Sequence, residues 1–204
     1  MTAYIICLIV GYFCGCISMG YFVGRFYHMD IRTKGSGNAG TTNVLRNLGK
    51  IPALITFAGD LVKAIIPILV IRLVFTPEQW YLWCLYCGLG VVLGHNYPFY
   101  LGFKGGKGIA VTAAVVMSAC HPLMIPIGLA IFIVMVALTR YVSLFVAWYI
   151  PANTLILYRD NPYFVHMMIL SLIFTALAYF QHRKNIVRLI HGNENPLWGN
   201  KKEA

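Results

Sequence analysis

Three polar segments interrupt an otherwise apolar chain, and each combines residues that can bind phosphate groups. They read KGSGNAGTTNVLRNLGK at residues 34–50, GHNYPFYLGFKGGKG at residues 94–108 and YFQHRKNIVRLIHGNE at residues 179–194. Glycine lets a backbone approach an anion closely, while lysine and arginine supply the opposite charge. If the three segments meet, they predict a site for anionic, phosphorylated molecules.

The first segment contains Gly-Ser-Gly-Asn-Ala-Gly at residues 35–40, which matches the glycine pattern of dinucleotide-binding loops. That pattern must follow a strand in a βαβ unit, whereas apolar helical runs flank this segment, and we therefore reject a dinucleotide site. Its small residues instead let backbone N–H groups point at an anion. Thr41 or Thr42 can cap a short helix whose positive end adds to this anion site, and Arg46 can bind phosphate in a bidentate manner.

The second segment resembles a P-loop but has neither its spacing nor its magnesium-binding hydroxyl, because Gly108 stands in the place of Ser or Thr. Its glycines still permit close approach to phosphate, and its lysines supply charge. The residues concerned are Lys104, Gly105, Gly106, Lys107 and Gly108. Two alternatives stay open. The lysines can instead anchor the loop to anionic lipid, and for His95 a structural hydrogen bond beneath the loop is favoured over acid–base work.

The third segment has a helical pattern in which His182, Asn185 and Leu189 share one face. Arg188 neighbours Asn185 on that helix. We predict that His182 and Asn185 reach a substrate. The alternative, a basic helix end lying among lipid headgroups, suits the neighbouring Arg and Lys but not His182.

Three further polar residues can belong to this site or only to the fold. Ser143 follows a predicted connection between two helices, where it caps the next helix or binds substrate. Asp60 and Lys63 lie three residues apart inside an apolar run. Charges within a membrane helix are candidates for function, but an ion pair that positions the helix explains these two at least as well, and we leave them out of the catalytic set.

The composition is that of a polytopic membrane protein. Of its 204 residues, 59% are hydrophobic and 11% are charged, and the mean hydropathy is +0.72. The net charge of +10 does not indicate nucleic-acid binding, because the basic residues lie between apolar runs. Cys84 and Cys87 form a CxxC pair within an apolar run, but zinc would need a second pair, so we expect packing residues and no metal site.

Apolar runs set the predicted fold. Residues 109–139 contain no Lys, Arg, Asp or Glu, and as one helix of about 46 Å they would exceed a bilayer core of about 30 Å. We therefore predict two short helices folded at His121-Pro122. Five further runs lie near the length of a membrane span: residues 4–26, 52–75, 80–100, 141–157 and 162–180. The predicted fold class is all-α, a single polytopic domain of residues 1–204 with seven transmembrane helices, the fourth and fifth short.

The distribution of basic residues predicts the orientation. With seven helices and the N-terminus outside, in the periplasm, thirteen Lys and Arg residues lie on one side and only Arg72 and Arg159 on the other. Positive residues favour the cytoplasmic side. We therefore expect a cytoplasmic C-terminus and three polar segments that meet at the cytoplasmic face.

This face has few acidic residues, and that scarcity limits the chemistry. Only Asp30, Glu194 and Glu203 are predicted there. A two-metal phosphotransferase needs several carboxylates for its ions, and carboxylate-pair chemistry needs two placed together. The chain also has no GxSxG nucleophile motif. An acyl transfer at this face would therefore need a donor that is already activated.

Three stretches together, GSGNAGTTN with Arg46, GHNYPFYLGFKGGKG and QHRKNIVRL, resemble the cytoplasmic motifs of the bacterial acyl-phosphate:glycerol-3-phosphate acyltransferases, the PlsY family. The resemblance covers essentially the whole chain, although Ala39 stands where many relatives have proline. It implies transfer of an acyl group from acyl-phosphate to the 1-hydroxyl of sn-glycerol 3-phosphate. The products are lysophosphatidic acid and inorganic phosphate, in the first acylation step of bacterial phospholipid synthesis.

The resemblance also implies the setting and the site. We expect a monomer in the bacterial cytoplasmic (inner) membrane, in contact with membrane lipid, without a cofactor and linked in function to the enzyme that produces acyl-phosphate. The implied catalytic set is Ser36, Arg46, Lys104, Ser143, His182 and Asn185. The expected substrate- and phosphate-binding residues are Gly37, Asn38, Gly40, Thr41, Thr42, Asn43, His95, Gly105, Gly106, Lys107, Gly108 and Arg188.

Two questions stay open at this point. The proton acceptor is His182, the best titratable candidate, or the phosphate of the acceptor itself. The rival class is a transporter or binding protein for phosphorylated anions, but transporters place such sites near the bilayer midplane in repeated halves, and this chain shows no repeat. A structural membrane subunit would leave the glycine-rich segments unexplained.

Overall fold

The computed structural model describes residues 2–75, 79–119, 125–128, 130, 133–134 and 145–192. Every regular element within these residues is a helix. The elements are α1 (Thr2–Cys16), α2 (Met19–Phe26), η1 (Ile31–Thr33), α3 (Thr41–Leu48), α4 (Lys50–Val74), α5 (Trp80–Asn96), η2 (Phe99–Leu101), α6 (Ile109–Ala119), α8 (Phe145–Tyr158) and α9 (Phe164–Ile190). The predicted all-α class is confirmed for the described residues.

Long apolar helices agree with the predicted membrane spans. Three stretches, residues 2–26, 50–74 and 164–190, are long and apolar enough to cross a bilayer, and α6 is a shorter apolar helix. The third stretch continues past the predicted end at residue 180, whereas the predicted span at residues 80–100 ends at Asn96. The predicted turn at His121-Pro122 and Ser143 lie outside the described residues, and the count of seven helices stays a prediction.

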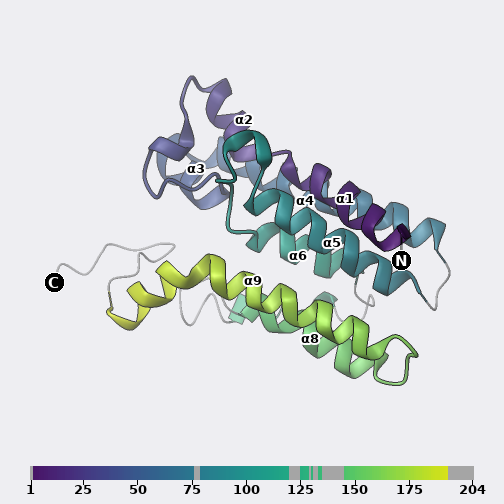
Figure 1. The fold of residues 1–204 in the computed structure, drawn as a ribbon. Coiled ribbons are helices and arrows are strands. Elements are labelled where there is room, and N and C mark those ends of the chain that lie inside the picture. The colour runs from purple at the N-terminus through teal and green to yellow at the C-terminus, as the bar shows by residue number, and fades with distance from the viewer. Residues whose placement is uncertain are drawn as a thin grey trace.

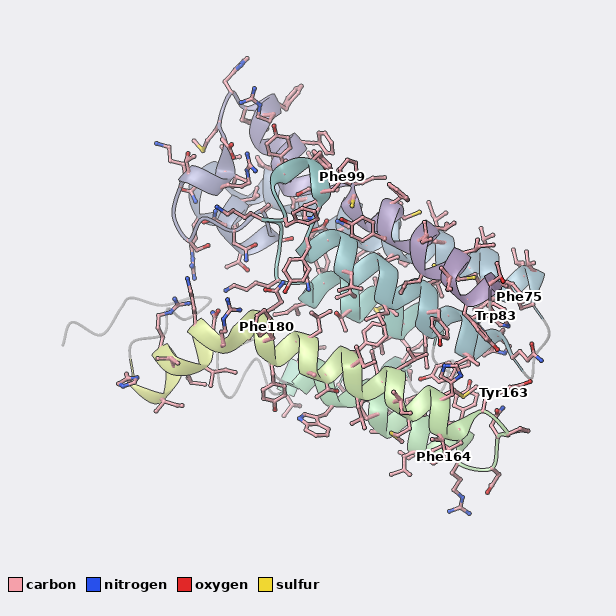
Figure 2. The ribbon with its side chains drawn as sticks, viewed as in Figure 1. Phe75, Trp83, Phe99, Tyr163, Phe164 and Phe180 are labelled. Carbon is pink, nitrogen blue, oxygen red and sulfur yellow. The ribbon has the colours of Figure 1, made fainter. Side chains whose placement is uncertain are left out.

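The long helices lie side by side, and α1 and α5 run in the same direction (Figure 1). The start of α1 contacts the start of α5, where the ring centroids of Tyr4 and Trp83 are 4.2 Å apart. Phe75 and Trp83 stack at this same end, and Figure 2 shows both there, with Tyr163 at the beginning of the last helix. The opposite end carries α2, η1, α3 and η2 (Figure 1). It therefore gathers the first two polar segments and the C-terminal part of α9.

The first predicted span is interrupted between α1 and α2. The break frees backbone groups, and inside a bilayer these need partners within the protein. The hydroxyl of Tyr100 donates to the Cys16 carbonyl at 2.7 Å and accepts from the Ser18 N–H at 3.3 Å. The Ile17 carbonyl accepts from Nζ of Lys63 at 2.8 Å. Side chains from later parts of the chain therefore bind the backbone groups that the break leaves without helical partners.

Glycines let α1 and α5 approach closely. Gly11 and Gly15 on α1 face α5, and Gly90 and Gly94 on α5 face α1, each pair spaced by four residues on one side of its helix. A side-chain carbon at any of the four positions would overlap a carbonyl oxygen of the partner helix. Small residues spaced in this way are typical of tight helix packing in membranes. This contact fixes the position of α5, which leads into the second polar segment.

The two neighbouring cysteines belong to the packed interior. Cys84 and Cys87 lie on α5 as free thiols, with exposed fractions of 0% and 1%. The Cys84 sulfur faces the Ile68 carbonyl of α4 at 3.8 Å. Their burial agrees with the predicted packing role.

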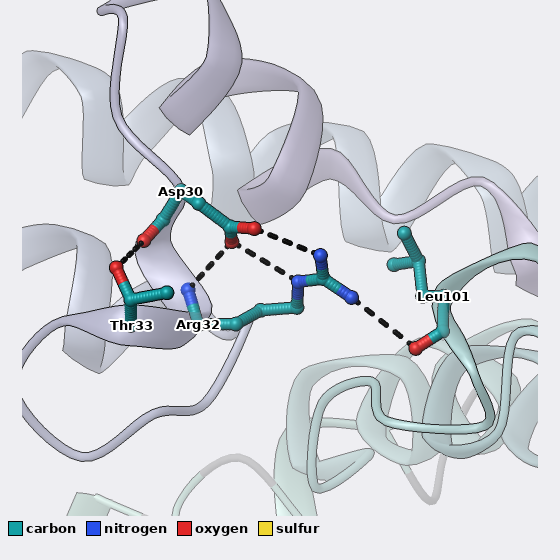
Figure 3. Close-up of polar contacts among 4 residues, drawn as sticks. All are labelled: Asp30, Arg32, Thr33 and Leu101. Atoms are coloured by element: carbon teal, nitrogen blue, oxygen red, sulfur yellow. Dashed lines mark hydrogen bonds and ion pairs between the residues drawn. The ribbon is translucent and has the colours of Figure 1, made fainter.

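Arg32, on η1 just before the first polar segment, joins η1 to η2 (Figure 3). Its guanidinium donates to both carboxylate oxygens of Asp30, at 3.0 and 2.8 Å, and to the Leu101 carbonyl at 3.2 Å. It also lies over the Tyr21 ring, 5.0 Å from the centroid. The hydrogen bond from Arg32 lowers the pKa of the Asp30 carboxyl. The carboxylate therefore stays ionised and orients the guanidinium towards η2.

The α1–α5 contact gives a direct test of the packing. We expect Gly15→Val to destabilise the protein by about 1–3 kcal/mol, because the new side chain would force the two backbones apart. The measurement is the free energy of unfolding in detergent. Ala58→Val is the matched control, since Ala58 is exposed on α4. Equal stability of the two variants would contradict the close contact.

Candidate active site

The loop of the first polar segment is shaped by Asn43. The side chain is 2% exposed, and its Oδ1 accepts from the Ser36 N–H at 3.0 Å. Its Nδ2 donates to the carbonyls of Ile31 and Lys34, at 2.9 and 3.0 Å. The same Oδ1 accepts from Nδ2 of Asn47 at 3.1 Å. Asn43 therefore stabilises the fold of the segment that carries Ser36, and its predicted binding of substrate stays a prediction.

The predicted short helix is present, but its predicted cap is wrong. The helix is α3, and its N-cap is Gly40, with no side-chain capping hydrogen bond. Thr41 and Thr42 are its first helical residues. Glycine is tolerated at an N-cap. The first N–H groups of α3 therefore donate to no N-cap side chain.

Two polar atoms beside this helix end are buried and have no hydrogen-bond partner in the described part of the chain. They are Oδ1 of Asn38 and Oγ1 of Thr41. A side-chain carbon at Gly40 would lie 3.1 Å from the Asn38 oxygen, so Asn38 packs directly on the N-cap. Burying polar atoms without partners is unfavourable. Both residues were predicted to hold phosphate, and that role stays a prediction.

The second polar segment packs on the C-terminal end of α5. The N–H groups of Gly105 and Gly106 donate to the carbonyls of Asn96 and His95, both at 3.0 Å. A side-chain carbon at Gly106 would overlap Nε2 of His95. These glycines are therefore required by packing. Their N–H groups are already used, so the predicted role of these two amides in holding phosphate is not supported.

The second and third polar segments meet at one hydrogen bond. Nζ of Lys107 donates to Oδ1 of Asn185 on α9 at 2.6 Å. His182 lies one turn earlier on the same helix and is 2% exposed, while Arg183 and Lys184 are exposed. The predicted polar face of His182 and Asn185 is therefore confirmed. The contact joins residues 78 positions apart in the sequence.

The end of α9 extends this polar face only in part. Arg188 is half-buried, as its place beside Asn185 predicts, whereas Leu189 is 37% exposed and does not share the covered face. An open hollow of about 470 Å³ is lined by Arg183, Lys184, Val187 and Arg188. Its lining includes neither His182 nor Asn185. The hollow is thus a basic surface next to the candidate site.

Several predicted site residues lie at the same end of the molecule but take no part in the Lys107–Asn185 contact. Ser36, Arg46 and Lys104 are exposed, as are Gly37 and Thr42. Long cationic side chains on the surface can reach a ligand without a fixed protein partner. Their joint action on a substrate stays a prediction.

His95, Asp60 and Lys63 form a cluster below the second segment. Nζ of Lys63 lies 2.7 Å from Oδ1 of Asp60 and 2.8 Å from Nδ1 of His95. All three side chains are buried. The ion pair considered for Asp60 and Lys63 is present, and His95 makes a structural hydrogen bond beneath the loop.

Asn96 is a candidate that the sequence analysis did not select. It is 2% exposed, and neither its Oδ1 nor its Nδ2 has a hydrogen-bond partner within the described residues. A side-chain carbon at Gly108 would lie 2.7 Å from Oδ1, and Gly108 has a left-handed φ of +84°. The signal available was an amide directly after His95, inside an otherwise apolar helix end. Asn96 joins the candidate binding residues.

The chain is similar to one family over nearly all of its length. A family model described as Glycerol-3-phosphate acyltransferase matches residues 5–192. A glycerol-3-phosphate acyltransferase of Clostridioides difficile (strain 630) is 41% identical, over 98% of this chain and 98% of the relative. One of Geotalea daltonii is 40% identical, over 96% of this chain and 98% of the relative. These relatives span the same length as this chain.

Solved structures have the same fold. A crystal structure of PlsY, an integral membrane glycerol 3-phosphate acyltransferase, in its glycerol 3-phosphate form has a TM-score of 0.81 at 33% identity, covering 96% of both chains. Its lysophosphatidic acid form has a TM-score of 0.78 at 32% identity, covering 95% of this chain and 94% of that one. Sequence, fold and apolar helices agree. This chain is an integral membrane protein and belongs to the glycerol-3-phosphate acyltransferase family of the PlsY type.

Proposed function

We propose that this protein transfers an acyl group from acyl-phosphate to the 1-hydroxyl of sn-glycerol 3-phosphate, giving lysophosphatidic acid and inorganic phosphate. The observation that carries the proposal is the Lys107–Asn185 contact of 2.6 Å, which joins two polar segments with matching family motifs. The related crystal structures are described as glycerol 3-phosphate and lysophosphatidic acid forms, an acceptor and a product of such a reaction. The acyl-phosphate donor rests on the resemblance of the motifs.

For this reaction the protein mainly has to position the two substrates and neutralise the charge on the leaving phosphate. The 1-hydroxyl oxygen attacks the acyl carbonyl carbon, and the bond between this carbon and the phosphate oxygen breaks. Phosphate leaves with the bonding electron pair, so no cofactor is needed. Lys107, held by Asn185, and the exposed Lys104 neutralise the charge on the leaving phosphate.

The acceptor occupies the neighbouring part of the site. Arg46 and Ser36 of the first segment bind glycerol 3-phosphate together with Ser143 and Asn185, and turn its 1-hydroxyl towards the carbonyl. Asn38, Thr41 and the N-terminal end of α3 add polar groups for phosphate. The acyl chain lies between helices in the membrane.

The proposed setting is the bacterial inner membrane, with seven crossings, the N-terminus outside and the C-terminus and active site cytoplasmic. The first two segments and the end of α9 at one end of the helices support it (Figure 1). In this setting the single domain acts as a monomer and receives its donor from the enzyme that makes acyl-phosphate. We assign no role in nucleic-acid binding.

A transporter for phosphorylated anions is the second candidate class. Its site would be expected near the bilayer midplane, whereas the Lys107–Asn185 contact lies at one end of α9. A purely structural subunit accounts for Gly105 and Gly106, which pack on α5. It gives no reason for the buried polar atoms of Asn38, Thr41 and Asn96.

A donor comparison tests the proposed reaction. Purified protein in lipid, given glycerol 3-phosphate and acyl-phosphate, should form lysophosphatidic acid, detected by mass spectrometry. Acyl-CoA at the same concentration should give none, because its acyl carbonyl is bonded to sulfur and not to the phosphate group that the lysines neutralise. Absence of product from acyl-phosphate would exclude the enzyme, and product from acyl-CoA alone would overturn the donor assignment.

The contact between the second and third segments predicts the effect of losing its lysine. We expect Lys107→Ala to lower kcat by about 100- to 1,000-fold, the usual effect of losing one group that stabilises transition-state charge. Lys184→Ala is the matched control, since Lys184 is exposed on the same helix as Asn185. Equal steady-state rates for the two variants would contradict the role of Lys107.

The proton acceptor can be tested through His182. If its imidazole accepts the proton of the 1-hydroxyl, His182→Gln should lower kcat by about 100- to 10,000-fold at saturating substrate. If the acceptor's own phosphate takes the proton, turnover should stay near that of the unmodified protein. Steady-state kinetics at saturation separate the two, because binding defects then no longer limit the rate.

A further inference from the structure

A buried cluster of charges lies directly beneath the candidate site, and the proposed mechanism does not use it. Asp60 and Lys63 on α4 and His95 on α5 have exposed fractions of 1%, 6% and 4%. Charges at such positions in a membrane helix are unfavourable unless partners satisfy them. Each charge of the cluster therefore depends on the other members for its partners.

Three polar atoms from different parts of the chain surround the ammonium nitrogen of Lys63. They are Oδ1 of Asp60 at 2.7 Å, Nδ1 of His95 at 2.8 Å and the Ile17 carbonyl at 2.8 Å. The lysine is thus held in one place, and it links three different parts of the chain.

One of these links reaches the first polar segment. The Ile17 carbonyl is free because the helix breaks between α1 and α2. Beyond this break, Gly20 on α2 packs against the Ala39 carbonyl so closely that a side-chain carbon would overlap it. The direction of α2 after the break therefore sets where the loop with Ala39 lies.

Another link reaches the second polar segment. The His95 carbonyl accepts from the Gly106 N–H at 3.0 Å, and Nε2 of the ring occupies the space that a side-chain carbon on Gly106 would need. Nδ1 of the same ring lies 2.8 Å from Nζ of Lys63. The lysine therefore supports, through the imidazole, the turn formed by Gly105, Gly106 and Lys107.

We propose that Lys63 is a positioning residue for acyl transfer. Its ammonium, anchored by Asp60, holds both the break that directs the first segment and the His95 ring that supports the second. The inference rests on the proposed function of the site. It adds that the Lys63 ammonium, which touches no substrate, fixes the position of the first polar segment relative to the second from inside the membrane.

The test compares Lys63→Met with the double variant Asp60→Asn/Lys63→Met, in purified full-length protein. Removing only the lysine leaves a buried, unpaired carboxylate, whereas the double variant removes both charges. We expect the double variant to regain thermal stability in detergent and still to lose about 100-fold in kcat/KM, the effect of a misplaced site. Lys50→Met, at the exposed start of the same helix, is the control.

Hydrogen exchange gives a readout that does not depend on the reaction. In both variants we expect faster exchange of the Gly105 and Gly106 amides, with the amides in the middle of α5 unchanged. Recovery of activity together with stability in the double variant would show that the pair only packs the core. Unchanged exchange in folded Lys63→Met would equally overturn the proposal. Failure of the unmodified protein to form product would instead contradict the proposed function and leave the exchange result standing.

Discussion

Inside a bilayer a backbone carbonyl without a helical partner has no water to bind, and this constraint organises the site end of the molecule. The break after Cys16 frees carbonyls within the first membrane stretch, and the hydroxyl of Tyr100 and the ammonium of Lys63 satisfy them. Each of these side chains comes from a different element. The irregular backbone that directs the first polar segment therefore exists only because α4 and η2 lie beside it.

The glycines of the second segment illustrate how one residue type can meet two demands. Gly105 and Gly106 read as an anion-binding loop, but their N–H groups donate to α5 and their missing side chains make room for His95. The loop is thereby fixed on a rigid helix end. Lys107 follows it directly and reaches Asn185. The short sequence Gly105-Gly106-Lys107 therefore both packs the loop on α5 and positions the lysine charge.

Much of the fold could be predicted from the sequence because apolar runs and basic residues report helix positions directly. The all-α class, the helix after Gly40 and the polar face of His182 and Asn185 followed from such patterns. The break at Ile17 could not be predicted, since it is stabilised by Lys63 and Tyr100 from distant positions. The loop contacts of Asn43 and the buried amide of Asn96 could not be predicted for the same reason, because both depend on tertiary neighbours.

The glycine contact between α1 and α5 also limits the routes by which a lipid tail can reach the site. Backbones that touch at Gly11, Gly15, Gly90 and Gly94 leave no crevice between them, and such close packing excludes even a methyl group. A lipid tail therefore cannot pass through this seam. Any lateral doorway from the bilayer to the site must open along other helices, on a side of the molecule that the seam does not close.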